Sequence, residues 1–402
     1  MNKRLSISSR ADMMPYSPIR KLVPLAYQAK DKGIKVCHLN IGQPDIPTPP
    51  QFMRAVRSYK QKVLAYGDSQ GDREYLKALA EYYKRRSIEV KPQDIVVTTG
   101  GSEAIIFAML CVADTDEELI VFEPFYPNYN GFARMADVKL VPITLRAENG
   151  FHLPSRSEIE KKITKKTRAI LVCSPNNPTG TVYTRKEMEM LAHICKKNNL
   201  FLLSDEVYRE FIYEGKHTSI LHLKGMEKRG IIIDSISKRF SACGARIGCL
   251  VSKNPEVINS AWRMGQARLC VPSIEQFAAK NALTINDSYF KKMTKEYKRR
   301  RDAAYQELMR IPGTVCVKPG GAFYIMAKFP ITDIEHFAKW MLTDFSLDGV
   351  TTMIAPGPGF YCTPNRGKDE ARIAYVLNVK DLRKAMKILA SGIKVYNSIG
   401  KK

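Results

Sequence analysis

A lysine between serines is the first group in this sequence whose surroundings suggest chemistry. Lys238 follows Ser235 and Ser237, just beyond the apolar run Ile231–Ile233, and Arg246 comes eight residues later. Hydroxyls and a guanidinium on one loop can hold a phosphate. A lysine amine at the end of a buried strand is desolvated and loses its proton readily, as Schiff-base chemistry requires. The segment therefore predicts an anion site beside a nucleophilic amine.

A carboxylate follows another apolar run. Asp205 comes after Leu200–Leu203, and the next basic residue is Arg209. A carboxylate at the end of a buried strand needs a cationic partner, and a pyridinium nitrogen would serve. Tyr208 lies three residues further on. Taken alone, Tyr208 is better explained as an aromatic residue of the core.

Four other positions have two interpretations each. Gly101 and Ser102 precede an apolar helix, where backbone N–H groups bind anions, but a turn and a cap use the same residues. Asn177 opens a turn of composition Asn-Pro-Thr-Gly, so its amide either binds a ligand oxygen or stabilises the turn. Tyr126 either contacts a ligand or packs in the core.

The elements that must position these residues alternate between strand and helix. Helical periodicity separates five continuous apolar runs, which are 95–99, 119–122, 169–173, 200–203 and 231–233. Such runs are typical of strands buried on both faces of a mostly parallel sheet. Thr184 and Glu187 form a capping box that predicts a helix to Lys197. Ligands bind beyond the carboxyl ends of such strands, where the residues above lie.

The chain divides into three segments by composition and by the pattern of apolar residues. Residues 1–51 are rich in proline and predict an N-terminal arm that completes a smaller domain. Residues 52–285 carry the alternating pattern and predict a large α/β domain. Residues 286–402 predict a small α+β domain with a helix at 289–310, strands near 315 and 323–325, a helix at 336–344 and a terminal helix from 380.

Composition excludes several classes of protein. Nine scattered cysteines and six dispersed histidines indicate free thiols in a reducing compartment, hence a cytoplasmic location, and no metal site. The longest apolar stretch, 104–113, is too short to span a bilayer, and the first residues show no secretory signal. The net charge of +24 is spread along the chain, which favours a solvated basic surface over nucleic-acid binding.

Taken together, these residues resemble the class I/II aminotransferases that depend on pyridoxal 5'-phosphate, particularly the aspartate aminotransferase group. Nine segments match in the family's order and cover nearly the whole chain. They are NIGQPDIPTP (40–49), Tyr66 to Gly71, TTGGSEAI (98–105), EPFYPNY (123–129), SPNNPTG (174–180), SDEVY (204–208), SISKRFSACGARIG (235–248), PGGAFY (319–324) and EARIAY (370–375). The resemblance implies fold type I, with a mostly parallel seven-stranded sheet between helices and a smaller α+β domain.

The resemblance also implies cofactor-binding roles. Lys238 would carry the cofactor and shuttle a proton, Asp205 would pair with the pyridine nitrogen, and Tyr126 would stack on the ring. Tyr208 and Asn177 would bind the ring's phenolic oxygen. The phosphate ligands would be Gly101, Ser102, Ser235, Ser237 and Arg246.

Substrate and partner follow from the same resemblance. Arg372 would clamp the α-carboxylate of an amino acid or 2-oxo acid, helped by Asn177 and the backbone of Gly42. Tyr66 would reach the phosphate of a neighbouring subunit, so a homodimer with shared active sites is expected. Aspartate and 2-oxoglutarate are the leading substrates, in amino acid metabolism or biosynthesis.

The sequence leaves alternatives open. Tyr126 stands where aspartate enzymes usually have tryptophan, and Cys243-Gly244-Ala245 replaces a more usual Thr-Gly-bulky triplet. Arg268 lies where some relatives read a side-chain carboxylate across the dimer, which would select dicarboxylates. An aromatic or kynurenine-type aminotransferase and a carbon–sulfur β-lyase would share the same residues. A non-catalytic, basic nucleic-acid-binding protein is the alternative from another class.

Overall fold

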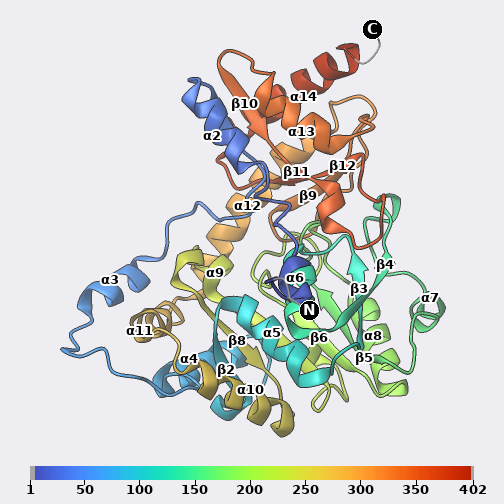
Figure 1. The fold of residues 1–402 in the computed structure, drawn as a ribbon. Helices are drawn as coiled ribbons and strands as arrows, with labels where there is room; N and C mark the ends of the chain where they lie inside the picture. The colour runs from blue at the N-terminus through green and yellow to red at the C-terminus, as the bar shows by residue number, and fades with distance from the viewer. Residues whose placement is uncertain (1–4, 400–402) are drawn as a thin grey trace.

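A seven-stranded sheet is the centre of the computed structural model, which describes residues 5–399 (Figure 1). In spatial order its strands are β2 Ile95–Thr99, β8 Ile247–Val251, β7 Gly230–Ser235, β6 Phe201–Asp205, β5 Thr167–Cys173, β3 Glu118–Glu123 and β4 Lys139–Thr144. Strand β8 is antiparallel to β2 and β7 on its two sides, and the other neighbouring pairs are parallel. The predicted α/β class and mostly parallel seven-stranded sheet are confirmed.

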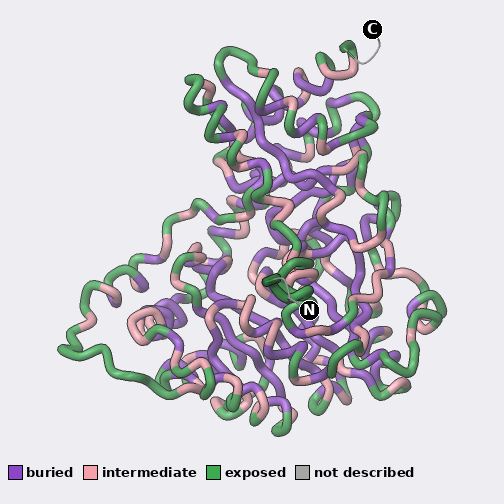
Figure 2. Tube along the Cα trace, in the orientation of Figure 1, coloured by how far each residue is buried: buried purple, intermediate pink, exposed green. Residues whose placement is uncertain are grey.

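Both faces of this sheet are buried. In β7, Ile232 belongs to one apolar cluster, whereas Ile231 and Ile233 belong to another. Successive residues of a strand point to opposite faces, so a continuous apolar run supplies two cores. Figure 2 shows the resulting buried layer in the lower part of the molecule.

Helices cover the sheet and connect its strands. Within residues 50–285 they are α3 Pro50–Ser58, α4 Arg73–Lys84, α5 Gly100–Val112, α6 Asn128–Ala136, α7 Arg156–Glu160, α8 Arg185–Lys197, α9 Ile236–Arg239, α10 Pro255–Arg268 and α11 Ser273–Ala282. Short 3₁₀ turns lie at Pro92–Asp94, Ala147–Asn149, Ile220–His222 and Cys243–Ala245. Thr184 and Glu187 form the predicted capping box of α8. No helix within residues 5–399 combines the length and apolarity needed to cross a bilayer.

The C-terminal residues form a second layer above the sheet (Figure 1). Its elements are α12 Asp287–Leu308, β9 Tyr324–Lys328, α13 Ile334–Thr343, β10 Val350–Met353, β11 Ala355–Pro356, a 3₁₀ turn at Gly357–Phe360, β12 Glu370–Ala374 and α14 Val379–Ile399. Strand β12 lies between β11 and β9 and is antiparallel to both. The expected strand near Val315 is wrong, because this residue makes only an isolated bridge to Lys328.

Part of the N-terminal segment joins this upper layer. The segment contains α1 Ser9–Asp12, α2 Val23–Asp31 and β1 Lys35–His38. Helix α1 lies near α6 instead, where Arg10 pairs with Asp137 (Figure 1). Strand β1 pairs in parallel with β10, and α2 packs against α13. Residues far apart in the sequence therefore lie side by side in this layer. The exact boundaries 1–51, 52–285 and 286–402 stay predictions.

Candidate active site

The parallel strands bring the predicted site residues to one edge of the sheet. Asp205 and Ser235 are the last residues of β6 and β7, and Cys173, the last residue of β5, pairs with Asp205. Asn177 lies four residues beyond β5. Because β5, β6 and β7 point the same way, their carboxyl ends meet and place these side chains together.

Lys238 lies in α9, the single turn that follows β7. Its Nζ donates to the carbonyl oxygen of Gly42 at 3.2 Å and lies 3.7 Å from the Cys243 sulfur. Burial lowers the pKa of the Lys238 amine, and the charges of Arg372 and Arg246 lower it further. This amine is therefore suited to act as a nucleophile.

The start of α5 and Arg246 form a cradle for an anion. Gly100 has φ +73°, and a Cβ there would lie 2.4 Å from Arg246 Nη2, so a side chain would displace the guanidinium. A Cβ at Gly101 would lie 3.8 Å from that of Ser235. The Ser235 hydroxyl lies 2.7 Å from that of Ser237. Helix N–H groups, two hydroxyls and a guanidinium thus converge, with Ser102 in the first turn of α5.

Asp205 is a buried carboxylate with few partners. Tyr129 donates to its Oδ2 at 2.7 Å, and the Val207 N–H donates to its Oδ1 at 3.3 Å. Burial raises the pKa of Asp205 to about 6 despite these hydrogen bonds. A cation beside this carboxylate would stabilise its charged form.

Arg372 supplies a buried guanidinium from β12. Its Nη1 donates to Asn177 Oδ1 at 2.9 Å, and its Nη2 donates to the carbonyl oxygen of Asn40. Its Nε is buried and has no hydrogen-bond partner among residues 5–399. Burial lowers the pKa of Arg372. A guanidinium held by neutral groups, with one N–H unpartnered, matches the needs of a carboxylate ligand.

Tyr324 connects the arginine to the lysine side of the site. Its ring lies 4.4 Å from the Arg372 guanidinium carbon, and its hydroxyl lies 2.8 Å from that of Tyr208. A Cβ at Gly42 would lie 1.9 Å from the Tyr324 hydroxyl oxygen. Gly42 therefore packs directly against Tyr324 while its carbonyl accepts from Lys238.

Two predicted aromatic residues have different positions. The Tyr126 hydroxyl accepts from Asn128 Nδ2 at 2.8 Å, and burial raises the pKa of Tyr126. Its ring packs edge-on against that of Tyr129, with 5.5 Å between the ring centroids, and Tyr129 in turn donates to Asp205. Tyr66 is 82% exposed on the segment between α3 and α4, and the structure does not bring it to the other site residues in its own chain.

Arg268, at the end of α10, is bonded within its own chain. Its Nε lies 3.2 Å from Glu103, and its two Nη atoms donate to the carbonyl oxygens of Leu269 and Val97 at 2.7 and 3.0 Å. Each nitrogen of this guanidinium already has a partner. The arrangement disfavours the expected role of Arg268 in reading a substrate carboxylate.

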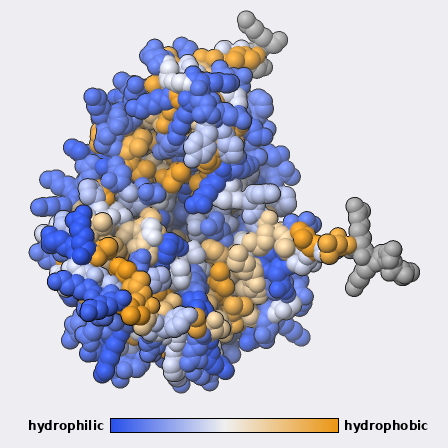
Figure 3. Space-filling view, turned by 60° about the vertical axis from the view of Figure 1, so that its left-hand side comes forward, coloured by the Kyte–Doolittle hydropathy of each residue, from blue (hydrophilic) through white to orange (hydrophobic). Residues whose placement is uncertain are grey.

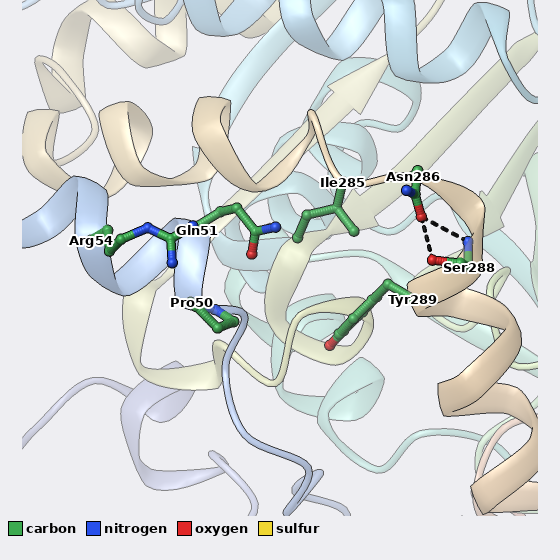
Figure 4. Close-up of a pocket in the computed structure, with 7 residues that line it drawn as sticks. All are labelled: Pro50, Gln51, Arg54, Ile285, Asn286, Ser288 and Tyr289. Carbon is green, nitrogen blue, oxygen red and sulfur yellow. Dashed lines mark hydrogen bonds between the residues drawn. The ribbon is translucent and has the colours of Figure 1, made fainter.

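The cavity shown in Figure 4 lies apart from these residues. It has a volume of about 320 Å³ and lies between α3 and the start of α12, and none of its seven lining residues is a predicted site residue. Within residues 5–399, no three His, Cys, Asp or Glu side chains are grouped so that they could hold a metal ion.

Four contacts to predicted site residues come from residues that the sequence interpretation missed. Tyr129 is hydrogen-bonded to Asp205, and Tyr324 to Tyr208. The Asn40 carbonyl accepts from Arg372, and the Cys243 sulfur contacts Lys238. All four lie inside the quoted motifs. Their roles depend on side-chain direction, which a motif does not specify.

The site combines an amine, an anion cradle, a buried carboxylate and a buried guanidinium. Together with the fold, this combination is that of a group-transfer enzyme of the α/β class. A family model described as "Aminotransferase class I and II" matches residues 34–392. The chain therefore belongs to the class I and II aminotransferases, as the resemblance implied.

Similar proteins include both aspartate and aromatic enzymes. The aspartate aminotransferase of Sulfurisphaera tokodaii is 34% identical over 369 residues, which cover 89% of this chain and 90% of the relative. Aromatic-amino-acid aminotransferase 2 of Thermococcus litoralis is 32% identical over 391 residues, covering 95% and 97%. These relatives support aminotransferase activity, with aspartate aminotransferase prominent among them.

Solved structures show the same relationship. The aspartate aminotransferase of Thermus thermophilus with maleate has a TM-score of 0.87 and 28% identity, and the match covers 96% of this chain and all of that one. The aspartate aminotransferase of Thermotoga maritima has a TM-score of 0.88 and 30% identity, with the same coverage. The fold is that of a class I and II aminotransferase.

Proposed function

We propose that the chain binds pyridoxal 5'-phosphate at the carboxyl edge of its sheet and transfers the amino group of an L-amino acid to a 2-oxo acid. Aspartate and 2-oxoglutarate are the leading pair. Maleate, a dicarboxylate, is named with one of the similar structures.

One observation carries this proposal. Tyr324 and Gly42 join the buried, incompletely paired guanidinium of Arg372 to the amine of Lys238. A carboxylate clamp beside a nucleophilic amine is what an amino acid needs in order to exchange its amino group. The anion cradle and Asp205 fit the phosphate and the pyridine nitrogen of the cofactor.

The bound cofactor would supply an electron sink. Lys238, whose amine has a lowered pKa, would hold the cofactor at rest; once the substrate's amino group has displaced it, the free amine would accept and return a proton. Asp205 would oppose positive charge on the ring nitrogen. Arg372 and Asn177, already hydrogen-bonded to each other at 2.9 Å, would hold the α-carboxylate, helped by the backbone N–H of Gly42.

The remaining residues would position the cofactor. Gly101, Ser102 and Arg246 would bind its phosphate from the start of α5 and from the loop before β8. Ser235 and Ser237 would complete the phosphate cradle from β7 and α9. Tyr126 would stack on the ring, and Tyr208 would bind its phenolic oxygen together with Asn177.

A homodimer is part of this proposal. Tyr66 lies on an exposed segment with Val63 and Leu64, which are 74% and 65% exposed. Figure 3 brings this side of the molecule toward the viewer and shows apolar patches on it. A partner subunit would cover them and receive Tyr66 in its phosphate cradle. All nine cysteines are unpaired, which supports a reducing, cytoplasmic location.

A second candidate keeps the chemistry and changes the substrate. The Thermococcus relative is named for aromatic amino acids and matches over 95% of this chain. Engagement of Arg268 inside the chain also removes one expected reader of dicarboxylates. An aromatic substrate is therefore the alternative to aspartate.

The visible spectrum of the protein reconstituted with pyridoxal 5'-phosphate tests both candidates. We expect a yellow band that L-aspartate bleaches and 2-oxoglutarate restores. Bleaching by phenylalanine but not by aspartate would favour the aromatic alternative. Borohydride reduction should fix the cofactor to the peptide that contains Lys238. Lys291→Ala removes an exposed lysine as the control and should leave this labelling unchanged. Absence of the band would contradict the proposed function.

A further inference from the structure

A buried ion pair closes the turn that carries Lys238. Asp234 belongs to β7 and Arg239 is the last residue of α9, so the two flank the segment that contains Lys238. Their side chains, 0% and 2% exposed, are in direct contact. Arg239 also donates from Nε and Nη2 to the carbonyl oxygen of Ser235, at 3.3 and 3.2 Å. One guanidinium therefore ties both the side chain and the backbone at the end of β7 to the end of α9.

Other buried groups hold this pair in place. The ring of Tyr82 lies 4.4 Å from the Arg239 guanidinium carbon, and Tyr83 donates to Asp234 Oδ2 at 2.7 Å. Both tyrosines belong to α4. Arg209 lies 3.4 Å from the same Oδ2. The ion pair with Asp234 and the packing of α4 therefore hold the Arg239 guanidinium in one position.

The residues between the paired ends are those assigned to the cofactor. Asp234 Oδ1 accepts from the Ser235 N–H at 2.7 Å, and Ser235 Oγ accepts from the Ser237 N–H at 3.1 Å. Lys238 leaves the same turn and reaches Gly42. The direction of three proposed ligands thus depends on a turn whose ends are fixed by Arg239.

We infer that Arg239 is a positioning residue: its pairing with Asp234 orients Ser235, Ser237 and Lys238 toward the cofactor without touching it. This inference rests on the proposed function. The same pair also acts through charge. Asp234 is one of the groups that raise the pKa of Asp205, and Arg239 offsets the charge of Asp234.

Affinity of the apoenzyme for pyridoxal 5'-phosphate tests the inference without measuring activity. We expect Arg239→Met to raise the dissociation constant about 10- to 100-fold, the size of one lost charged hydrogen bond. Arg239→Lys, which keeps the charge, should recover most of the affinity. Arg239→Met should also shift the pH midpoint of the visible band upward, because Asp234 then keeps only the more distant Arg209, at 3.4 Å, to offset its negative charge, whereas Arg239→Lys should leave the midpoint unchanged.

A matched control separates positioning from loss of stability. Arg301 in α12 is also fully buried and paired, with Glu214 at 2.8 Å and Asp302 at 2.9 Å, but it lies outside the site. Arg301→Met should destabilise the protein and keep the wild-type dissociation constant. If Arg239→Met does not fold, Asp234→Asn breaks the same ion pair and should weaken the cofactor in the same way.

The outcomes distinguish this inference from the proposed function. Wild-type cofactor affinity in Arg239→Met or Asp234→Asn, or equal weakening in Arg301→Met, would overturn the positioning role alone. Failure of the wild-type protein to bind pyridoxal 5'-phosphate would overturn the proposed function and this inference with it.

Discussion

Two adjacent carboxylates, Asp205 and Glu206, belong to regions of opposite character. Both are buried at the end of β6. Glu206 is 3.0 Å from both Arg209 and His217, and it accepts from the Ser219 hydroxyl and the Ile220 N–H at 2.9 and 3.1 Å. Within residues 5–399, Asp205 accepts hydrogen bonds only from the Tyr129 hydroxyl and the Val207 N–H.

Their pKa values record this difference. Burial alone would raise both, but Arg209 and His217 lower the pKa of Glu206 to about 2. Burial dominates at Asp205 and raises its pKa to about 6. The network around Glu206 supplies its own cation, Arg209, whereas Asp205 forms no ion pair within residues 5–399.

The arginines of the two regions differ in the same way. Arg209 faces two carboxylates, Glu206 at 3.0 Å and Asp234 at 3.4 Å. Arg372 instead donates to neutral groups, Asn177 Oδ1 and the Asn40 carbonyl, and forms no ion pair within the described part of the chain. Buried charge that lacks an opposite charge is therefore the feature that distinguishes the candidate site from the network around Glu206.

Asp205→Asn gives the largest expected effect on this comparison. Transamination should fall about 10³- to 10⁴-fold, because the amide cannot oppose positive charge on the ring nitrogen. Steady-state kinetics at saturating cofactor measures the loss. Glu206→Gln is the matched control and should keep kcat per cofactor-loaded molecule within about threefold. Equal losses in both variants would remove the distinction between the two regions.

Glu206→Gln should instead lower the free energy of unfolding by about 3 kcal/mol at pH 7, because Arg209 loses its nearest anion. Urea denaturation of the apoenzyme measures it. The folded pKa of Glu206 lies below its ordinary value of 4.5, so its contribution is present above pH 4.5 and is lost as the pH falls toward 2. A difference that persists undiminished at pH 3 would contradict this assignment.

The sequence predicted the strand-end residues well and the network poorly. Lys238, Asp205 and Ser235 could be placed because continuous apolar runs define buried strands and polar residues directly follow them. Strand β4 was missed because Pro142 interrupts its apolar pattern, and β8 because Gly248 interrupts its apolar run.

Contacts across the chain could not be predicted. The pairing of Asp234 with Arg239 is local in sequence, but the packing of Tyr82 against it depends on how α4 docks. Arg268 shows the reverse case. Its position in the sequence suggested a substrate ligand, and only the fold reveals that Glu103 and two carbonyl groups occupy it.

The apoenzyme should become less stable as Asp205 ionises. Its pKa rises from 3.8 to about 6 on folding, so the folded state loses about 3 kcal/mol in total as the pH rises through this range. About half of that loss falls between pH 5 and pH 8. Asp205→Asn should be free of it, so the variant gains roughly 1 to 2 kcal/mol relative to wild type over this interval. Urea denaturation at both pH values checks the gain, and parallel pH dependence in the two proteins would refute it.

Arg268→Ala has the smallest expected effect. Its guanidinium bonds Glu103 and the carbonyl oxygens of Val97 and Leu269, so its removal should weaken the packing of α10 by about 1 kcal/mol without changing substrate choice. We expect the ratio of kcat/KM for aspartate to that for alanine to stay within about twofold of wild type, since a factor of two is below 0.5 kcal/mol. Arg263→Ala, on the exposed face of α10, is the control for helix surface changes. A selective loss for aspartate would place Arg268 with the incompletely paired charges of the site, despite its partners within the chain.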